Sequence, residues 1–126
     1  MLSLAMRGDT PYIKCLVAFY AFLDVQRSAY KETENAEMLA AFSPITYLAK
    51  DPSALPPMFV ARAGRDEVPM MNDSIDRFTN LAISKNADLT FANHPTGVHG
   101  FDNQNDDARS REIIQSVIAF LNSHLN

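Results

Sequence analysis

Residues 56–69 decide the fold, and they read Pro-Pro-Met-Phe-Val-Ala-Arg-Ala-Gly-Arg-Asp-Glu-Val-Pro. An apolar run, Met58–Ala63, ends at Gly64, and Asp66 follows two residues later. Val68 and Pro69 then open a helical pattern. This order predicts a strand, a tight turn, a carboxylate and the start of a helix. Functional groups in open α/β sheets gather where the strands end, so Asp66 is a candidate functional acid.

A second unit of the same kind lies downstream. Residues 89–92 predict a strand, and residues 93–105 predict a long loop that contains the sequence Gly-Val-His-Gly-Phe-Asp at 97–102. His99 is the histidine of that loop. Three of the four glycines in the chain lie beside Asp66 or His99, where tight turns would need them. An acid that holds the Nδ1–H of a histidine is two thirds of a hydrolytic triad.

The composition limits the class of protein. The chain has 126 residues, 47% of them hydrophobic, with a net charge of −4. This predicts one domain spanning residues 1–126. The basic residues are scattered, which argues against nucleic acid and anionic membranes as partners. A single cysteine, Cys15, excludes an intrachain disulfide and favours a reducing, cytoplasmic location. The longest apolar run, residues 15–23, is too short for a membrane helix, which needs about 20 residues.

The strands are expected to be parallel. The run from Ile13 to Tyr20 is almost continuously apolar, as in a strand buried on both faces. Together with Met58–Ala63 and residues 89–92 it gives about three strands that alternate with helices. This alternation predicts an α/β fold with right-handed crossovers. Residues 1–8 are expected to form the end of a helix.

Two short helices are predicted between the first and second strands. Thr33 is the expected cap of the first, and Ser43 with Pro44 supplies the N-cap and first residue of the second. Asp51 begins the turn that ends it. The apolar residues expected on these helices are Met38, Leu39, Phe42, Ile45, Tyr47 and Leu48.

Two longer amphipathic helices are predicted after the second strand. Pro69 is the expected first residue of one, and Asp106 and Asp107 suit the first turn of the other. The apolar stripe of the first consists of Met71, Ile75, Phe78 and Ala82. The stripe of the second consists of Ile114, Ile118, Leu121 and Leu125, with Ile113, Val117 and Phe120 alongside.

The two turns together resemble the carboxyl-terminal half of an α/β-hydrolase, in the group of dienelactone hydrolases, esterases and lipases. In that group a G-x-D-x-x-V-P-like turn carries the acid and an H-G-F turn carries the histidine. The resemblance implies that Asp66 is the triad acid and His99 the triad base. It also implies a partial α/β-hydrolase fold, whose strands are the last three of the family's sheet. A small ester or acyl substrate and no cofactor are the further expectations.

The family's nucleophile motif, G-x-S-x-G, does not occur in this sequence. Ser3 lies inside a helical stretch rather than on a strained turn, and Cys15 lies within a strand where it suits a small core residue. The nucleophile and the oxyanion hole are therefore expected from elsewhere. Loss of a nucleophile costs on the order of a millionfold in turnover, so the chain alone is expected to be nearly inactive.

Other interpretations remain open at this stage. Asp66 could be a helix cap, and His99 a solvent-exposed bystander. An Asp66–His99 pair could activate water without a nucleophile, although nothing supplies the charge stabilisation that this needs. A metal site at His94, His99 and Asp102 is disfavoured by its spacing. Finally, an exposed apolar edge at residues 13–20 predicts a homodimer and a non-catalytic interaction module.

Overall fold

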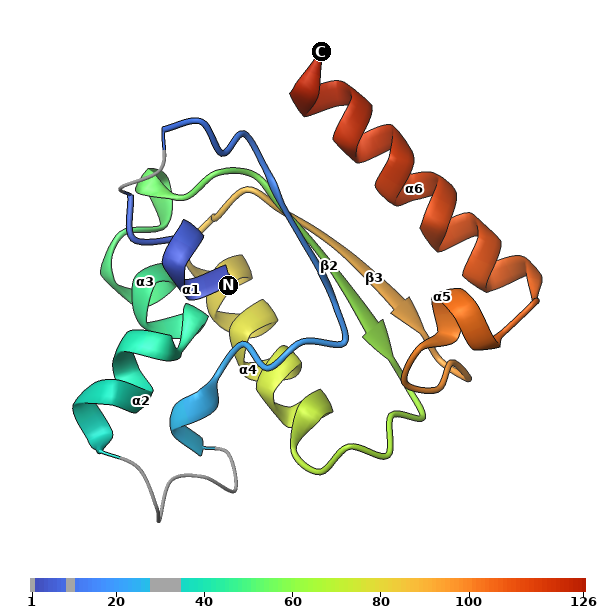
Figure 1. The fold of residues 1–126 in the computed structure, drawn as a ribbon, viewed down its shortest axis with the longest axis horizontal. Helices are drawn as coiled ribbons and strands as arrows, with labels where there is room; N and C mark the ends of the chain where they lie inside the picture. Colours follow the sequence, from blue (N-terminus) through green and yellow to red (C-terminus); the bar gives the residue numbers. More distant parts are fainter. Residues whose placement is uncertain (1, 9–10, 28–34) are drawn as a thin grey trace.

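The computed structural model describes residues 2–8, 11–27 and 35–126. Three parallel strands form one sheet in the order β1-β2-β3, with helices on both faces (Figure 1). The strands are β1, Leu16–Phe19; β2, Met58–Ala63; and β3, Leu89–His94. The predicted α/β class and parallel sheet are confirmed. All three strands run in one direction, so their carboxyl ends lie along the same edge of the sheet.

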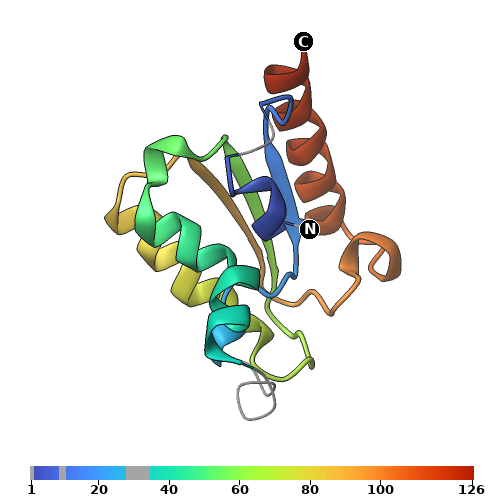
Figure 2. The same ribbon diagram turned by 60° about the vertical axis from the view of Figure 1, so that its left-hand side comes forward.

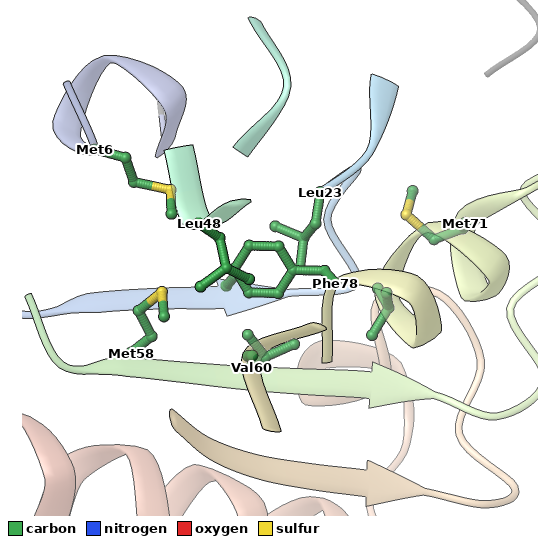
Figure 3. Close-up of a cluster of buried hydrophobic side chains, with 10 residues drawn as sticks. Met6, Leu23, Leu48, Met58, Val60, Met71 and Phe78 are labelled. Carbon is green, nitrogen blue, oxygen red and sulfur yellow. The ribbon is translucent and has the colours of Figure 1, made fainter. Parts of the chain in front are cut away.

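The central strand β2 separates two hydrophobic clusters. Met58 and Val60 belong to the first, whereas Phe59, Ala61 and Ala63 belong to the second. This alternation follows from the period of two in a strand, and both faces of β2 are apolar because both are covered by helices. Figure 3 shows Met58 and Val60 pointing toward side chains from the helices above the sheet.

Helices α1, Leu2–Ala5; α3, Pro44–Lys50; and α4, Met71–Ser84, contribute to or flank the first cluster. The predicted stripe of α4 is confirmed, because its four residues are all buried in that cluster. They are Met71, Ile75, Phe78 and Ala82. Figure 2 shows α3 and α4 on one side of the sheet and α6 on the other.

Helix α6, Ala108–Leu125, covers the second face, but not with the stripe that we expected. Ile118 is 53% exposed, and the buried residues of the helix are Ile113, Val117 and Phe120. Of the expected stripe, Leu121 packs against the second cluster and is partly buried. Two adjacent stripes of this helix are apolar, so periodicity could not choose between them. Buried Ser110, one turn before Ile113, lies on the sheet-facing side as well.

The first predicted strand is wrong in its extent and burial. β1 covers four residues rather than residues 13–20, and among them only Ala18 is buried. It lies at an edge of the sheet and pairs only with β2 among the described strands. An edge strand lacks a neighbour on one side, which leaves the side chains of β1 partly exposed. Cys15 is likewise only partly buried, beside the second cluster.

Several helix boundaries differ from expectation. Thr33 lies outside the described residues, and α2, Ala36–Phe42, is capped by the side chain of Asn35. Only Leu39 of this helix is buried, because α2 lies at the outside of the molecule. Pro69 does not begin α4, whose cap is Met70 in the left-handed conformation at φ 64°. The predicted loop at 93–105 contains the end of β3 and α5, Phe101–Gln104.

Buried hydroxyls fix the segment that follows β1. The Oγ of Ser74 accepts hydrogen bonds from the backbone N–H groups of Leu23 and Asp24, both at 2.8 Å. The Oγ of Ser43 accepts from the N–H of Val25 at 3.0 Å, and this serine makes no side-chain cap bond to its own helix. The carboxylate of Asp24 pairs with Arg77 of α4 at 2.7 Å. These bonds anchor the short 3₁₀ helix Val25–Arg27 to α3 and α4.

A further 3₁₀ helix, Pro52–Ala54, follows α3, and Asp51 caps it by accepting from the N–H of Ser53. Among the residues that the structure describes, no helix is both long enough and apolar enough to cross a bilayer.

Candidate active site

The turn after β2 buries the carboxylate of Asp66. The backbone N–H of Asp66 donates to the carbonyl of Ala63 at 3.1 Å, which closes the turn. Its Oδ1 accepts from the N–H of Val68 at 2.9 Å, which is the local bond that favours aspartate at such a position. The side chain is 0% exposed. One carboxylate oxygen is therefore committed to the backbone, and Oδ2 remains for another donor.

The acid turn and the histidine loop are joined directly by their backbones. The N–H of Gly64 donates to the carbonyl of His94 at 2.8 Å, and the N–H of Arg65 donates to the carbonyl of Gly97 at 2.8 Å. A Cβ on Gly64 would lie 2.3 Å from the carbonyl oxygen of Pro95, closer than atoms can approach. Glycine at position 64 is thus what allows the two segments to lie side by side.

His99 lies in this loop and faces Asp66. Its Nδ1 is 2.8 Å from Oδ2 of Asp66, and its side chain is 44% exposed. A carboxylate can only accept hydrogen bonds, so Nδ1 carries the proton in this pair. In the neutral ring Nε2 then has a free lone pair. Within the described part of the chain, Nε2 makes no hydrogen bond. The arrangement can accept a proton at Nε2 and stabilise the charge that results.

The histidine loop is supported from both sides. Gly100 adopts φ 83°, a left-handed conformation that glycine tolerates, and directly precedes α5. Gln104 of α5 donates its side-chain amide to the carbonyl of His99 at 3.1 Å. Phe101 is fully buried in the second hydrophobic cluster. A buried anchor therefore sits two residues from His99, which ties the loop to the core.

Tyr20 and Asp102 complete the surroundings of His99, and the sequence did not predict either role. Tyr20 follows β1, and its ring centroid lies 4.4 Å from that of His99. Its hydroxyl donates to Oδ1 of Asp102 at 2.5 Å. Burial, and next the bond to Asp102, raise the pKa of Tyr20 to about 12. In the sequence Tyr20 ends the apolar run 13–20, which predicts only a strand.

His94, one of the residues considered as metal ligands, packs against the histidine loop. It is buried, and its Nε2 lies 3.1 Å from Oδ1 of Asp107 and 3.0 Å from Oγ of Ser110. A Cβ on Gly97 would lie 2.6 Å from Cγ of His94, so the loop packs directly on this ring. No cluster able to hold a metal occurs among the described residues. His94 therefore links β3 and the loop to the start of α6.

Asp107 is the cap of α6. Its Oδ1 accepts from the N–H of Ser110 at 2.8 Å. This bond chiefly, and the contact with His94 to a lesser degree, lower the pKa of the Asp107 carboxyl. The prediction that Asp106 and Asp107 lie in the first turn is wrong, because α6 begins at Ala108 and Asp107 is its N-cap.

Neither nucleophile considered from the sequence meets His99. Ser3 is buried in α1, within the helix as expected. Cys15 precedes β1 and packs beside the second hydrophobic cluster. Among the described residues, no serine hydroxyl or cysteine thiol forms a hydrogen bond with His99. In the part of the chain that the structure describes, the site consists of an acid, a histidine and the residues that hold them.

Comparison of the sequence with models of protein families and with curated proteins finds no match. Solved structures do resemble the chain. A thermophilic esterase from the Planctomycetes species Thermogutta terrifontis, in its native form, matches with a TM-score of 0.66 at 18% identity, over 86% of this chain and 41% of that one. Its butyrate-bound form gives a TM-score of 0.65 at 19% identity, over 87% and 43%.

An acetyl ester-xyloside bifunctional hydrolase from Caldicellulosiruptor lactoaceticus matches with a TM-score of 0.69 at 18% identity, over 87% of this chain and 42% of that one. The chain spans less than half the length of each of these structures. At such identities the likeness concerns the fold. The parallel sheet, its flanking helices and this likeness show that the chain has the fold of part of an α/β-hydrolase.

Proposed function

We propose that Asp66 and His99 are the acid and the base of a hydrolase that acts on carboxylic esters. The observation that carries the proposal is the 2.8 Å hydrogen bond between Nδ1 of His99 and the buried Oδ2 of Asp66. This bond holds the tautomer in which Nε2 can act as a general base, and the exposed side of the ring is open to a reactant.

The reaction has two stages. Nε2 of His99 takes the proton from a serine hydroxyl or cysteine thiol as that group attacks the ester carbonyl, and then gives the proton to the departing alkoxide. Water then attacks the acyl-enzyme. Nε2 of His99 takes a proton from this water and returns it to the serine or cysteine as the acid is released. Asp66 stabilises the imidazolium at each stage. The attacking group and the oxyanion donors come from outside the two loops described above, so we expect the 126-residue chain to be nearly inactive by itself.

Short acyl esters are the first substrates to test. One structure with a similar fold is an esterase with bound butyrate, and another is an acetyl ester hydrolase. Within this class, the turn that reads His-Gly-Phe at 99–101 resembles that of dienelactone hydrolases. A dienelactone is accordingly the second substrate to test.

The test supplies the missing nucleophile from solution. The purified chain is incubated with a p-nitrophenyl ester of a short acid and with trifluoroethanol, and transfer of the acyl group to the alcohol is measured. General base catalysis by a positioned side chain typically contributes about 10²–10⁴-fold, and for an alcohol held by no binding site we expect roughly tenfold. His99→Ala and Asp66→Asn should both lose this acceleration, the second because an amide no longer selects the Nδ1–H tautomer of His99.

His124→Ala is the matched control, because His124 is a partly exposed histidine near the end of α6. It should keep the wild-type rate. An equal rate for wild type and His99→Ala would contradict the proposal. Labelling of the wild-type chain by a fluorophosphonate would show that a nucleophile is present after all, and Ser3 would be examined first.

A non-catalytic interaction module is the second candidate, favoured by one observation. An apolar groove of about 350 Å³ lies beside the edge strand β1 and α1. It is lined by Leu2, Leu4, Ala5, Tyr12, Ile13, Leu16 and Val17. An edge strand can pair with the same strand of a second copy across a two-fold axis, which would cover this groove in a homodimer.

A further inference from the structure

The ring of Tyr20 packs against the His99 imidazole, with centroids 4.4 Å apart and planes tilted by 53°. We propose that Tyr20, held in place by Asp102, is a positioning residue that fixes the orientation of the His99 ring. The inference rests on the proposed role of His99 as a base, and it adds a second constraint to the one that Asp66 provides.

A single hydrogen bond does not fix a partly exposed histidine. The bond from Nδ1 to Asp66 restrains one end of the ring, but rotation about the bond between Cβ and the ring is soft for histidine. Contact with a second ring restricts this rotation. The two restraints complement each other, since one is a hydrogen bond at Nδ1 and the other is a contact with a neighbouring ring. Together the bond to Asp66 and the contact with Tyr20 fix the direction in which Nε2 points.

Tyr20 is itself held rigidly. Its backbone adopts φ 33°, which is rare for a residue with a side chain and is maintained only by surrounding contacts. The ring packs edge-on against Phe19 and Phe101, each with centroids 5.9 Å away. The hydroxyl donates to Asp102, and its raised pKa of about 12 keeps it a donor wherever an imidazole can act as a base.

The arrangement brings together the ends of all three strands. Tyr20 follows β1, Asp66 follows β2, and His99 follows β3 on the way to Asp102 in α5. The Tyr20–Asp102 bond joins residues 82 positions apart and spans the His99 loop. Asp102 is exposed, so its carboxylate does not contribute to the hydrophobic core. If this bond had only a structural role, its loss would leave the His99 ring unaffected. If the bond positions Tyr20 against His99, its loss should loosen the His99 ring.

The experiment measures the Nδ1 proton of His99 by NMR in the 126-residue chain labelled with ¹⁵N-histidine. The variants are Tyr20→Leu, Tyr20→Phe and Asp102→Ala, and Asn103→Ala on the same short helix is the control. We expect Tyr20→Leu to exchange this proton with water about tenfold faster, a factor comparable to the contact energy of an aromatic pair. Tyr20→Phe and Asp102→Ala keep the ring at position 20 but remove its hydrogen bond to Asp102. They should increase the exchange rate by a smaller factor, and Asn103→Ala should not change it.

Two outcomes would overturn the inference. One is an unchanged exchange rate and tautomer in Tyr20→Leu or, if that variant does not fold, in Asp102→Ala. The other is an equal rise in Asn103→Ala, which would mean that any change in α5 disturbs the loop. Failure of the proposed function looks different: the wild-type Nδ1 proton would remain protected and sensitive to Tyr20, while acyl transfer would not depend on His99.

Discussion

At Gly64 a hydrogen in place of a side chain lets the acid turn meet the histidine loop. We expect Gly64→Ala to destabilise the protein by roughly 2–3 kcal/mol, in the upper range for overpacking, because its Cβ would lie 2.3 Å from the carbonyl oxygen of Pro95. Separation of the two segments should also weaken the bond between His99 and Asp66. Urea unfolding and the NMR signal of the His99 Nδ1 proton would measure the two effects.

Gly8→Ala is the control for that substitution. Gly8 has φ 84°, and a Cβ added there would have no atom within 4 Å, so only backbone strain of roughly 1–2 kcal/mol is expected. The His99 signal should not change in Gly8→Ala. An unchanged signal in Gly64→Ala as well would show that the two turns do not depend on their close approach.

At the scale of the element, Ser74 of α4 holds the segment that follows β1. Its Oγ accepts from two buried backbone N–H groups, those of Leu23 and Asp24. We expect Ser74→Ala to lower the free energy of unfolding by about 2–4 kcal/mol, since each buried donor left without a partner costs roughly 1–3 kcal/mol. Chemical denaturation would measure the loss.

Ser84→Ala in the same helix is the matched control, because Ser84 is exposed and its hydroxyl donates to the carbonyl of Leu81 in its own helix. Its effect should stay within about 0.5 kcal/mol. Equal effects of the two substitutions would contradict the anchoring role of Ser74.

The carboxylate that caps α6 makes the stability of the protein depend on pH in the acidic range. The pKa of Asp107 is lowered in the folded state, chiefly by the N–H of Ser110. Stability from this group is therefore fully present above the unfolded pKa of about 3.9 and is lost as the pH falls through the lower, folded value. We expect Asp107→Asn to be less stable than wild type at pH 7, and the difference to shrink as the pH is lowered below about 4.

Urea unfolding at a series of pH values would follow this difference. Gln115→Ala, on the exposed side of the same helix, changes no charge and should keep the wild-type pH profile. A gap between wild type and Asp107→Asn that stays constant down to strongly acid pH would show that the carboxylate of Asp107 is not stabilised by folding.

At the scale of the whole molecule, the proposed homodimer would cover the groove beside β1. If a second copy does, Tyr12→Lys should weaken the dimer at least tenfold, the effect of about 1.4 kcal/mol, because it places a charge in the apolar contact. Tyr12 is 75% exposed, so the fold itself should be unaffected. Sedimentation velocity over a range of concentrations would measure the association.

Ile83→Lys is the control for association. Ile83 is 66% exposed, but it lies on α4 and not in the groove. It should leave the dimer intact. A wild-type chain that sediments as a monomer at every concentration would contradict the homodimer.

Features with a local cause were predictable from the sequence alone. The strand Met58–Ala63 begins and ends where the apolar run does, and the stripe of α4 is buried as its spacing indicates. Asp66 and His99 could be selected because each follows a strand and is flanked by glycine. Steric limits on the backbone and the periods of helix and strand act over a few residues, so the amino-acid order itself determines them.

Only the tertiary structure decided which distant residues meet. The stripe that α6 buries, the contact of Tyr20 with His99, and the bonds from Ser74 to Leu23 and Asp24 all join segments far apart in the chain. Several apolar stripes or hydroxyls satisfy the local rules equally well. The choice among them depends on shape and hydrogen-bond partners that exist only once β1, β2 and β3 lie side by side with their helices.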